Sequence, residues 1–402
     1  MPVFSTKNIG RFNVVFSAGA WRMMASLNSF IISLLVVRFY SPAFWGGIVA
    51  VLLFIDLGFA IVNWGFAPYL DHAFSFNPNN MKAMWQKSVV SRLLPFCIFI
   101  GVVGFWGFTF QVQIIIVVWS AMRFLYQSFD PVIQFERNFL FSFVVETIGL
   151  ISLAIPILIF QKTLTAEEIM ALYGLSFAIR AFFTTIFYRD FFRLSSLPPK
   201  LDEIRKFLLA AFPFLLLTFS AMLQQRVDLY ICALYLPNAE TAQYQVLLNL
   251  LLLSQVGANF LLAPFTKNIF RLPAPAMQKL EKKFIKVGFI LALLCSALVY
   301  GILTIGYQFH LSTISYAMGY IYILTFYFYL MRIYDLRKSS RQTTIVYCSF
   351  AGCTVNLVAS FLLVPKFGLN GALFSGMSTQ IFIAVLYRLP AFMTQKNAKS
   401  GS

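Results

Sequence analysis

The sequence predicts an all-α polytopic membrane protein with about 12 transmembrane helices, and three observations lead to this fold class. Hydrophobic residues make up 60% of the 402 residues and charged residues only 11%, a composition that soluble domains of this size do not reach. Apolar runs long enough to cross a bilayer recur along the whole chain. Lysine and arginine gather in alternate connections between those runs.

Predominantly apolar segments of roughly 20 residues or more divide the chain into spans joined by short connections. The predicted spans are residues 12–40, 44–70, 84–109, 112–135, 139–160, 166–188, 206–236, 240–265, 284–308, 311–331, 342–364 and 369–390. The first run lacks the short apolar core and cleavage site of a signal peptide, so we expect it to be retained as a span. No connection is long enough to fold as an extramembrane domain.

The net charge of +17 has a sidedness that fixes the expected topology. Most lysines and arginines outside the spans fall in one set of connections, whereas the opposite set holds Lys162 and Lys366. Positively charged loops stay in the cytoplasm, so both termini are predicted to be cytoplasmic. Cytoplasmic location of both termini requires an even number of spans. Because long apolar runs separate the basic clusters, the lipid bilayer and not a nucleic acid is the expected partner.

A weak two-fold repeat suggests that the spans form two halves. Tyr40-Ser41-Pro42 follows the first span, and Tyr235-Leu236-Pro237 follows the seventh. Two six-helix bundles are therefore predicted, over residues 1–195 and 196–402, with the same topology because six is an even number.

Several charged residues are predicted to lie deep in the membrane, on helix faces that also carry polar residues at steps of three and four. The deep arginines are Arg22, Arg123, Arg180 and Arg226, and the deep acids are Asp56 and Asp228. Arg22 and Arg226 lie about ten residues from the nearest span end, or roughly 15 Å. Arg38 and Arg92 lie closer to span ends, so their head groups are expected at the interface. Asp130 and Glu146 remain ambiguous in depth.

Two interpretations of the deep set stay open. The acids and arginines pair in a purely structural network, for which Arg226 with Asp228, Arg22 with Asp56, and Arg123 with Asp130 are the candidates. Alternatively, because the deep arginines outnumber the deep acids, they line a water-filled cationic cavity that receives an anionic head group. Guanidinium groups match phosphate oxygens with two parallel hydrogen bonds.

The second half carries no deep charge after Asp228, only amides such as Asn249 and Asn356 and many aromatic residues, which usually serve packing. His72 and His310 lie near interfaces, and neither a metal site nor a nucleophile with its base can be assembled. We therefore predict a protein that is not an enzyme and that has no cofactor. The absence of a nucleotide-binding motif argues against direct use of ATP.

The stretch VNLVASFLLVPKFGLNGALFSGMSTQ, with Pro365, Gly368 and Gly371-Ala372, ends one helix at a proline and turns tightly into the next. This stretch resembles the end of bacterial polysaccharide flippases, the O-antigen and exopolysaccharide branch of the multidrug, oligosaccharidyl-lipid and polysaccharide exporter superfamily. VVRFYSPAFWGG is similar to that family's first turn, although Ala43 and Phe44 stand where an acid is common.

The resemblance implies two six-helix bundles around a central cavity lined by the first, second, seventh and eighth spans. Its implied substrate is an undecaprenyl-diphosphate-linked oligosaccharide, moved across the bacterial cytoplasmic (inner) membrane by alternating access. A proton or sodium ion gradient, or the membrane potential, is the implied driver, and other polysaccharide-assembly membrane proteins are possible partners. The expected substrate-binding residues are Arg22, Arg123, Arg180, Arg226 and Asn249, and the expected ion-coupling residues are Asp56 and Asp228.

Two alternatives share parts of this pattern. A multidrug or cation antiporter of the related branch has the same architecture, but its substrates need acids rather than a cationic deep set. A membrane polysaccharide polymerase would need a sizeable outer loop with catalytic side chains, and the longest outer loop, around QKTLTAEE, is short.

Overall fold

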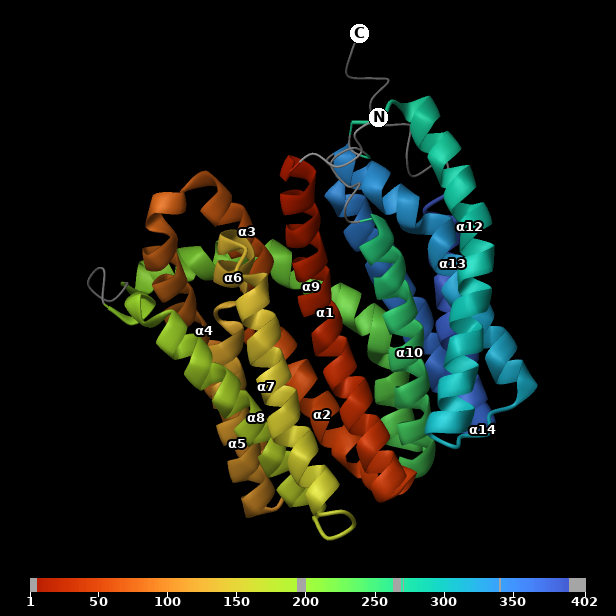
Figure 1. Cartoon of the computed structure of the whole chain (residues 1–402), viewed down its shortest axis with the longest axis horizontal. Coiled ribbons are helices and arrows are strands. Elements are labelled where there is room, and N and C mark those ends of the chain that lie inside the picture. Colours follow the sequence, from red (N-terminus) through yellow and green to blue (C-terminus); the bar gives the residue numbers. More distant parts are fainter. Residues whose placement is uncertain (1–5, 194–199, 263–268, 270, 340, 390–402) are drawn as a thin grey trace. The chain divides into compact units, whose positions relative to one another are not determined.

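The computed structural model describes residues 6–389 with the exception of 194–199, 263–268, 270 and 340 (Figure 1). Within these residues the chain is all-α, as predicted. The helices are α1 (Thr6–Phe39), α2 (Pro42–Val62), α3 (Phe66–Phe76), η1 (Pro78–Asn80), α4 (Met81–Phe105), α5 (Phe110–Gln127), α6 (Asp130–Glu136), α7 (Phe139–Ile159), α8 (Ala166–Phe187), η2 (Arg189–Phe192), α9 (Leu201–Tyr235), α10 (Asn238–Leu262), α12 (Ala274–Gly301), the π-helix η4 (Ile302–Gly306), α13 (Thr313–Lys338) and α14 (Gln342–Leu386).

Each of the twelve predicted spans falls on helical residues. Nine helical stretches of the described chain are long and apolar enough to cross a membrane, and these cover ten of the predicted spans, because the last stretch holds two. The other two predicted spans are α1 and α10. Outward-facing side chains are strongly apolar, with Phe105 95% exposed and Ile305 82% exposed, as expected for surfaces that face lipid.

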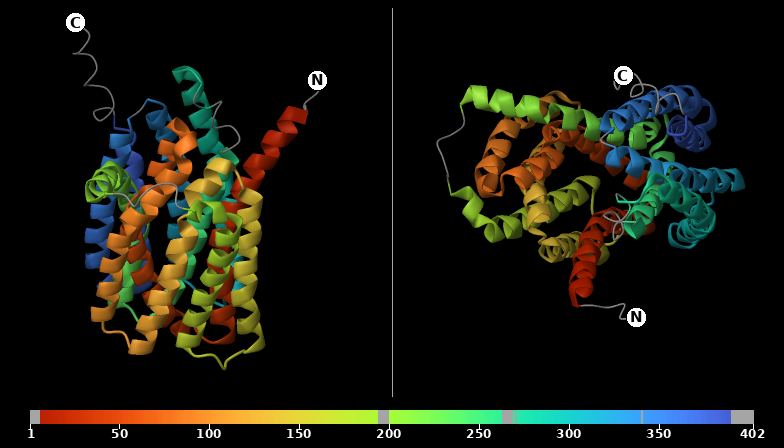
Figure 2. Two further views of the ribbon diagram at one scale, coloured as in Figure 1. Left: turned by 90° about the vertical axis from the view of Figure 1, so that its left-hand side faces the viewer. Right: turned by 90° about the horizontal axis from the view of Figure 1, so that it is seen from above.

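The chain divides into two compact units, Met1–Phe219 and Ser220–Ser402, and the division falls inside α9. In the first unit α5 packs along α8, α8 along α7, and α7 along α1 (Figures 1 and 2). In the second unit α13 packs against both α12 and α14.

Local sequence explains where several helices begin. Ser41 caps α2 by accepting a hydrogen bond from the Phe44 N–H at 3.1 Å, and Pro42 supplies a helical backbone angle without needing a partner for a missing N–H. Thr165 and Glu168 form a reciprocal capping box at the start of α8.

Two predicted spans differ from the structure, because each is broken into two helices. The span predicted at 44–70 is interrupted between α2 and α3, where Gly65 has φ 68° and a Cβ there would lie 2.2 Å from the Leu215 backbone nitrogen. The span predicted at 112–135 is interrupted between α5 and α6, just before Pro131, which cannot donate a helical hydrogen bond.

The last two predicted spans are confirmed as two helices within the continuous stretch α14. Gly368, with φ 57° and ψ −136°, is not helical and turns the chain between them. A Cβ on Gly371 would lie 2.3 Å from the Leu363 carbonyl oxygen, so the turn requires glycine at this position as well.

Candidate functional site

The first polar cluster is an ion pair between α2 and α5 in the first unit. Nη1 of Arg123 lies 2.8 Å from Oδ1 of Asp56, and the two side chains are 16% and 27% exposed. The guanidinium also lies over the Phe59 ring, 4.7 Å from its centroid. Arg123 therefore pairs with Asp56 of a neighbouring helix, and not with Asp130 as the sequence suggested.

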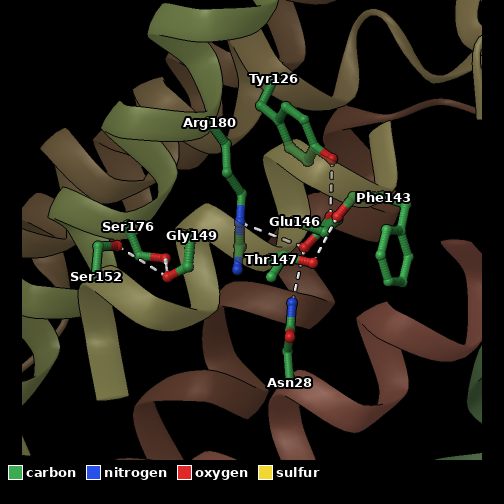
Figure 3. Close-up of polar contacts among 9 residues, drawn as sticks. All are labelled: Asn28, Tyr126, Phe143, Glu146, Thr147, Gly149, Ser152, Ser176 and Arg180. Atoms are coloured by element: carbon green, nitrogen blue, oxygen red, sulfur yellow. Dashed lines mark hydrogen bonds and ion pairs between the residues drawn. The ribbon is translucent and has the colours of Figure 1, made fainter. Parts of the chain in front are cut away.

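The second cluster centres on Glu146 of α7 and joins four helices (Figure 3). Asn28 Nδ2 of α1 donates to one carboxylate oxygen at 2.8 Å, and the Tyr126 hydroxyl of α5 donates to the other at 2.8 Å. Arg180 of α8 forms an ion pair with Glu146, with Nε 3.3 Å from Oε2. Glu146 is 6% exposed and Arg180 is 6% exposed, so this charge pair is buried.

The absence of a side chain at Gly149 of α7 makes room for the Arg180 side chain of α8. A Cβ on Gly149 would lie 2.1 Å from Arg180 Nε, and the Ser176 hydroxyl donates to the Gly149 carbonyl at 2.6 Å (Figure 3). The Phe177 ring lies 4.8 Å from the guanidinium carbon. Arg180 is therefore held between the Glu146 carboxylate, the Phe177 ring and the Gly149 backbone. These contacts favour the interpretation that Arg180 belongs to a structural network.

The Arg92 head group of α4 is buried inside the protein and does not extend to its surface as its sequence position had suggested. It is 3% exposed, and its guanidinium donates to Ser128 Oγ at 3.0 Å, to Asn63 Oδ1 at 3.4 Å and to the Ser88 carbonyl at 3.4 Å. The sequence prediction rested on the closeness of Arg92 to a span end, which gives no information about the acceptors around its head group. The breaks after α2 and α5 bring oxygen acceptors to Arg92 inside the protein.

The second unit contains one buried acid of a different kind, Asp228 of α9, which is 1% exposed. The Tyr244 hydroxyl of α10 donates to its Oδ2 at 2.6 Å, and the Leu229 N–H donates to its Oδ1 at 2.8 Å. The hypothesis that Arg226 neutralises Asp228 within α9 is not supported, since the hydroxyl and the N–H that donate to this carboxylate are neutral groups.

Polar side chains from both halves of α14 extend the network around Asp228. Asn356 lies against the carboxylate, and its Oδ1 accepts hydrogen bonds from Ser375 at 2.8 Å and Ser360 at 3.1 Å. A Cβ on Gly376 would lie 2.9 Å from Asp228 Oδ2, so this glycine leaves space beside the carboxylate.

The remaining predicted site residues lie on three different helices. Arg226 is half-buried on α9, and Asn249 is half-buried on α10. Arg22 falls on α1, but its side chain lies outside the described residues. Among the described residues, no group of three or more histidine, cysteine, aspartate or glutamate side chains is placed to hold a metal ion.

Comparison with known proteins identifies the fold. No protein-family model matches this chain, and no curated protein matches it in sequence. Among solved structures it is similar to the lipid II flippase MurJ in an inward closed conformation, with TM-score 0.67 and 11% identity over 91% of this chain and 85% of that one.

Two further structures have the same arrangement of helices. A MOP superfamily transporter from Pyrococcus furiosus matches with TM-score 0.63 and 12% identity, over 94% of this chain and 93% of that one. An inward-facing multidrug resistance MATE family transporter of the same superfamily matches with TM-score 0.60 and 15% identity, over 96% of both chains. The chain therefore has the fold of the MOP transporters, as a multi-pass membrane protein.

Proposed function

We propose that this chain is a flippase that moves an undecaprenyl-diphosphate-linked oligosaccharide, the repeat unit of a polysaccharide, across the bacterial cytoplasmic membrane by alternating access. The observation that carries the proposal is the presence of arginines inside membrane-spanning helices on a MOP-transporter fold. Arg123 keeps 16% of its side chain exposed, and Arg226 is half-buried. Guanidinium groups at such depth are costly unless an anion or water attends them.

The substrate set that we propose is Arg22, Arg123, Arg226 and Asn249. The arginines would bind the diphosphate oxygens through paired hydrogen bonds, and the Asn249 amide would bind a sugar hydroxyl. We leave Arg180 out of this set, because it is buried against Glu146 and has no exposed face to offer a substrate.

Ion coupling is proposed at Asp56 and Asp228. A proton or sodium ion bound at Asp228 would compensate a buried carboxylate whose hydrogen-bond donors are neutral groups. A proton taken up by Asp56 would weaken its pairing with Arg123 and free that guanidinium for the diphosphate. The ion gradient or the membrane potential would then drive the cycle.

The topology that accompanies this proposal has both termini in the cytoplasm, because the basic loops lie on that side. Other membrane proteins of polysaccharide assembly would deliver the lipid-linked substrate and take up the product.

Purified protein in vesicles that contain a fluorescent undecaprenyl-diphosphate oligosaccharide tests the proposal. Transfer between leaflets is measured by quenching with an agent that does not cross the membrane. Arg226→Gln should slow transfer about 10- to 100-fold, because a hydrogen bond to a charged group contributes about 1.5–3 kcal/mol. Arg38→Gln, at an exposed position near the end of α1, is the matched control and should transfer at the parent rate. Equal rates in protein-free vesicles would contradict the proposal.

A multidrug transporter is the second candidate, because the MATE family transporter covers 96% of this chain at TM-score 0.60. The same vesicles distinguish the two. Organic cations should be exported, and should compete with one another, only if this second candidate is correct.

A further inference from the structure

Two broken helices meet inside the first unit. α2 ends at Val62 and α3 begins at Phe66, while α5 ends at Gln127 and α6 begins at Asp130. The Asn63 side chain in the first break donates to the Gln127 side chain beside the second, at 3.4 Å. The backbone leaves the right-handed helical region at Trp64 and Gly65 in the first break, whereas Ser128 and Phe129 keep helical angles, so the second break is a kink before Pro131. At membrane depth, backbone departs from the helix only where it is buried in protein or lines a cavity, and interrupted helices in transporters commonly form ion sites.

Arg92 of α4 connects the two breaks. Its Nη1 donates to Asn63 in the first break, and its Nη2 donates to Ser128 in the second. The Trp85 indole, also on α4, donates to the Ser128 carbonyl at 2.8 Å. A single helix therefore holds both interruptions in place through one charged group and one ring.

A small cavity lies at this junction, with a volume of about 30 Å³. Its polar lining consists of Asn63, Arg92, Gln127, Ser128 and Asp130. This volume admits one water molecule, which would find several hydrogen-bond partners among these side chains.

Asp130 lines the same cavity as Arg92 but does not pair with it. In the described part of the chain no basic group lies within 4.0 Å of the Asp130 carboxylate, and the Arg92 donors reach neutral oxygens instead. The charged groups that act on Asp130 are Arg92, Arg123, Glu146 and Asp71, two of each sign. A guanidinium and a carboxylate beside one cavity are expected to pair when both are charged, so the observed arrangement fits a neutral, protonated Asp130.

We propose that the paired helix breaks, Arg92 and Asp130 form a proton-binding site separate from Asp56 and Asp228. Asp130 gains and releases its proton by exchange with hydronium in the surrounding solution, and the water in the cavity relays that proton. When the proton leaves, the carboxylate attracts the Arg92 guanidinium away from Asn63 and Ser128, and the connection between the two breaks loosens. The proposal concerns the first unit alone and does not depend on which substrate the protein carries.

Infrared difference spectroscopy of the purified full chain, without any substrate, tests this site. The parent protein should show the carbonyl band of a protonated carboxylic acid at neutral pH, and Asp130→Asn should lose one carboxyl component of that band. Glu136→Gln removes an exposed acid from the same helix and should leave the band unchanged. A spectrum of Asp130→Asn that equals the parent spectrum overturns the proposal.

A second variant keeps the test decisive if Asp130→Asn does not fold. Arg92→Gln removes the positive charge that favours the ionised carboxylate, so the protonated band should persist to higher pH than in the parent. If Arg92 has a purely structural role, the band should disappear at the same pH in Arg92→Gln as in the parent protein. That result would also overturn the proposal.

Discussion

Two buried acids, Glu146 in the first unit and Asp228 in the second, have opposite kinds of partner. In the first unit Glu146 pairs with Arg180 at 3.3 Å, and Asp56 pairs with Arg123 at 2.8 Å. In the second unit Asp228 is as deeply buried as Glu146, but a hydroxyl and a backbone N–H supply its hydrogen bonds.

The Glu146 charge is balanced permanently by an arginine of the protein, whereas the Asp228 charge can be balanced by a proton or cation that binds and leaves. An arginine is protonated under all ordinary conditions, so the Glu146 cluster carries its counterion permanently within the fold. A carboxylate that only neutral donors stabilise still carries a net charge, which a bound proton or cation can balance and later release. We therefore expect neutralisation of Glu146 to lower stability and neutralisation of Asp228 to remove ion dependence.

The largest expected effect comes from neutralising the two acids in turn. Glu146→Gln should lower the free energy of unfolding by about 3–5 kcal/mol, because it leaves the buried Arg180 charge without a counterion. Asp228→Asn leaves no cation behind and should cost about 1 kcal/mol, through altered hydrogen bonding alone. Denaturant unfolding in detergent measures both variants.

The comparison fails if the two variants lose the same stability. A double variant sharpens it: replacing both Glu146 and Arg180 by neutral residues should restore part of the stability that Glu146→Gln loses, because no buried charge remains.

The helices were predictable because a bilayer leaves few choices for the backbone. Every N–H and C=O within hydrocarbon needs an internal partner, so a long apolar run must be helical. The turns at Ser41-Pro42 and at Gly368 were also predictable, because proline and glycine limit the backbone locally. The break at Gly65 was missed because it lies in an apolar run, where hydropathy alone gives no boundary.

The partners of the polar residues were harder to predict than their depth. Periodicity places Arg123 on one face of its helix but does not say which helix lies opposite, so its pairing with Asp56 needed the tertiary structure. The depth of Glu146 was left open, and its partners Asn28 and Tyr126 gave no signal, since amides and tyrosines are common in such helices. Gly149 was a usable signal, because a glycine one turn from a buried acid allows a large side chain to approach.

The second effect concerns the hydroxyl that bonds to Asp228. Tyr244→Phe should cost about 1.5–3 kcal/mol, because it removes a hydrogen bond to a charged group and leaves a buried carboxylate oxygen with less support. Tyr329→Phe is the matched control, since that hydroxyl donates to the neutral Gln380 amide at the same 2.6 Å distance. Its cost should be about 0.5–1.5 kcal/mol. Equal losses in the two variants would indicate that Asp228 is already protonated in the folded protein.

The smallest effect separates the two ion pairs of the first unit from each other. Arg123→Gln should cost about 1 kcal/mol or less, because the Arg123–Asp56 pair is partly exposed and therefore partly screened. Its cost should also shrink as salt is added, whereas the cost of Glu146→Gln should not, because ions do not reach a buried pair. Unfolding measured at low and at high salt tests this. A salt-independent cost for Arg123→Gln would mean that water does not reach this guanidinium, and the proposal that Arg123 receives a diphosphate from a hydrated passage would have to be abandoned.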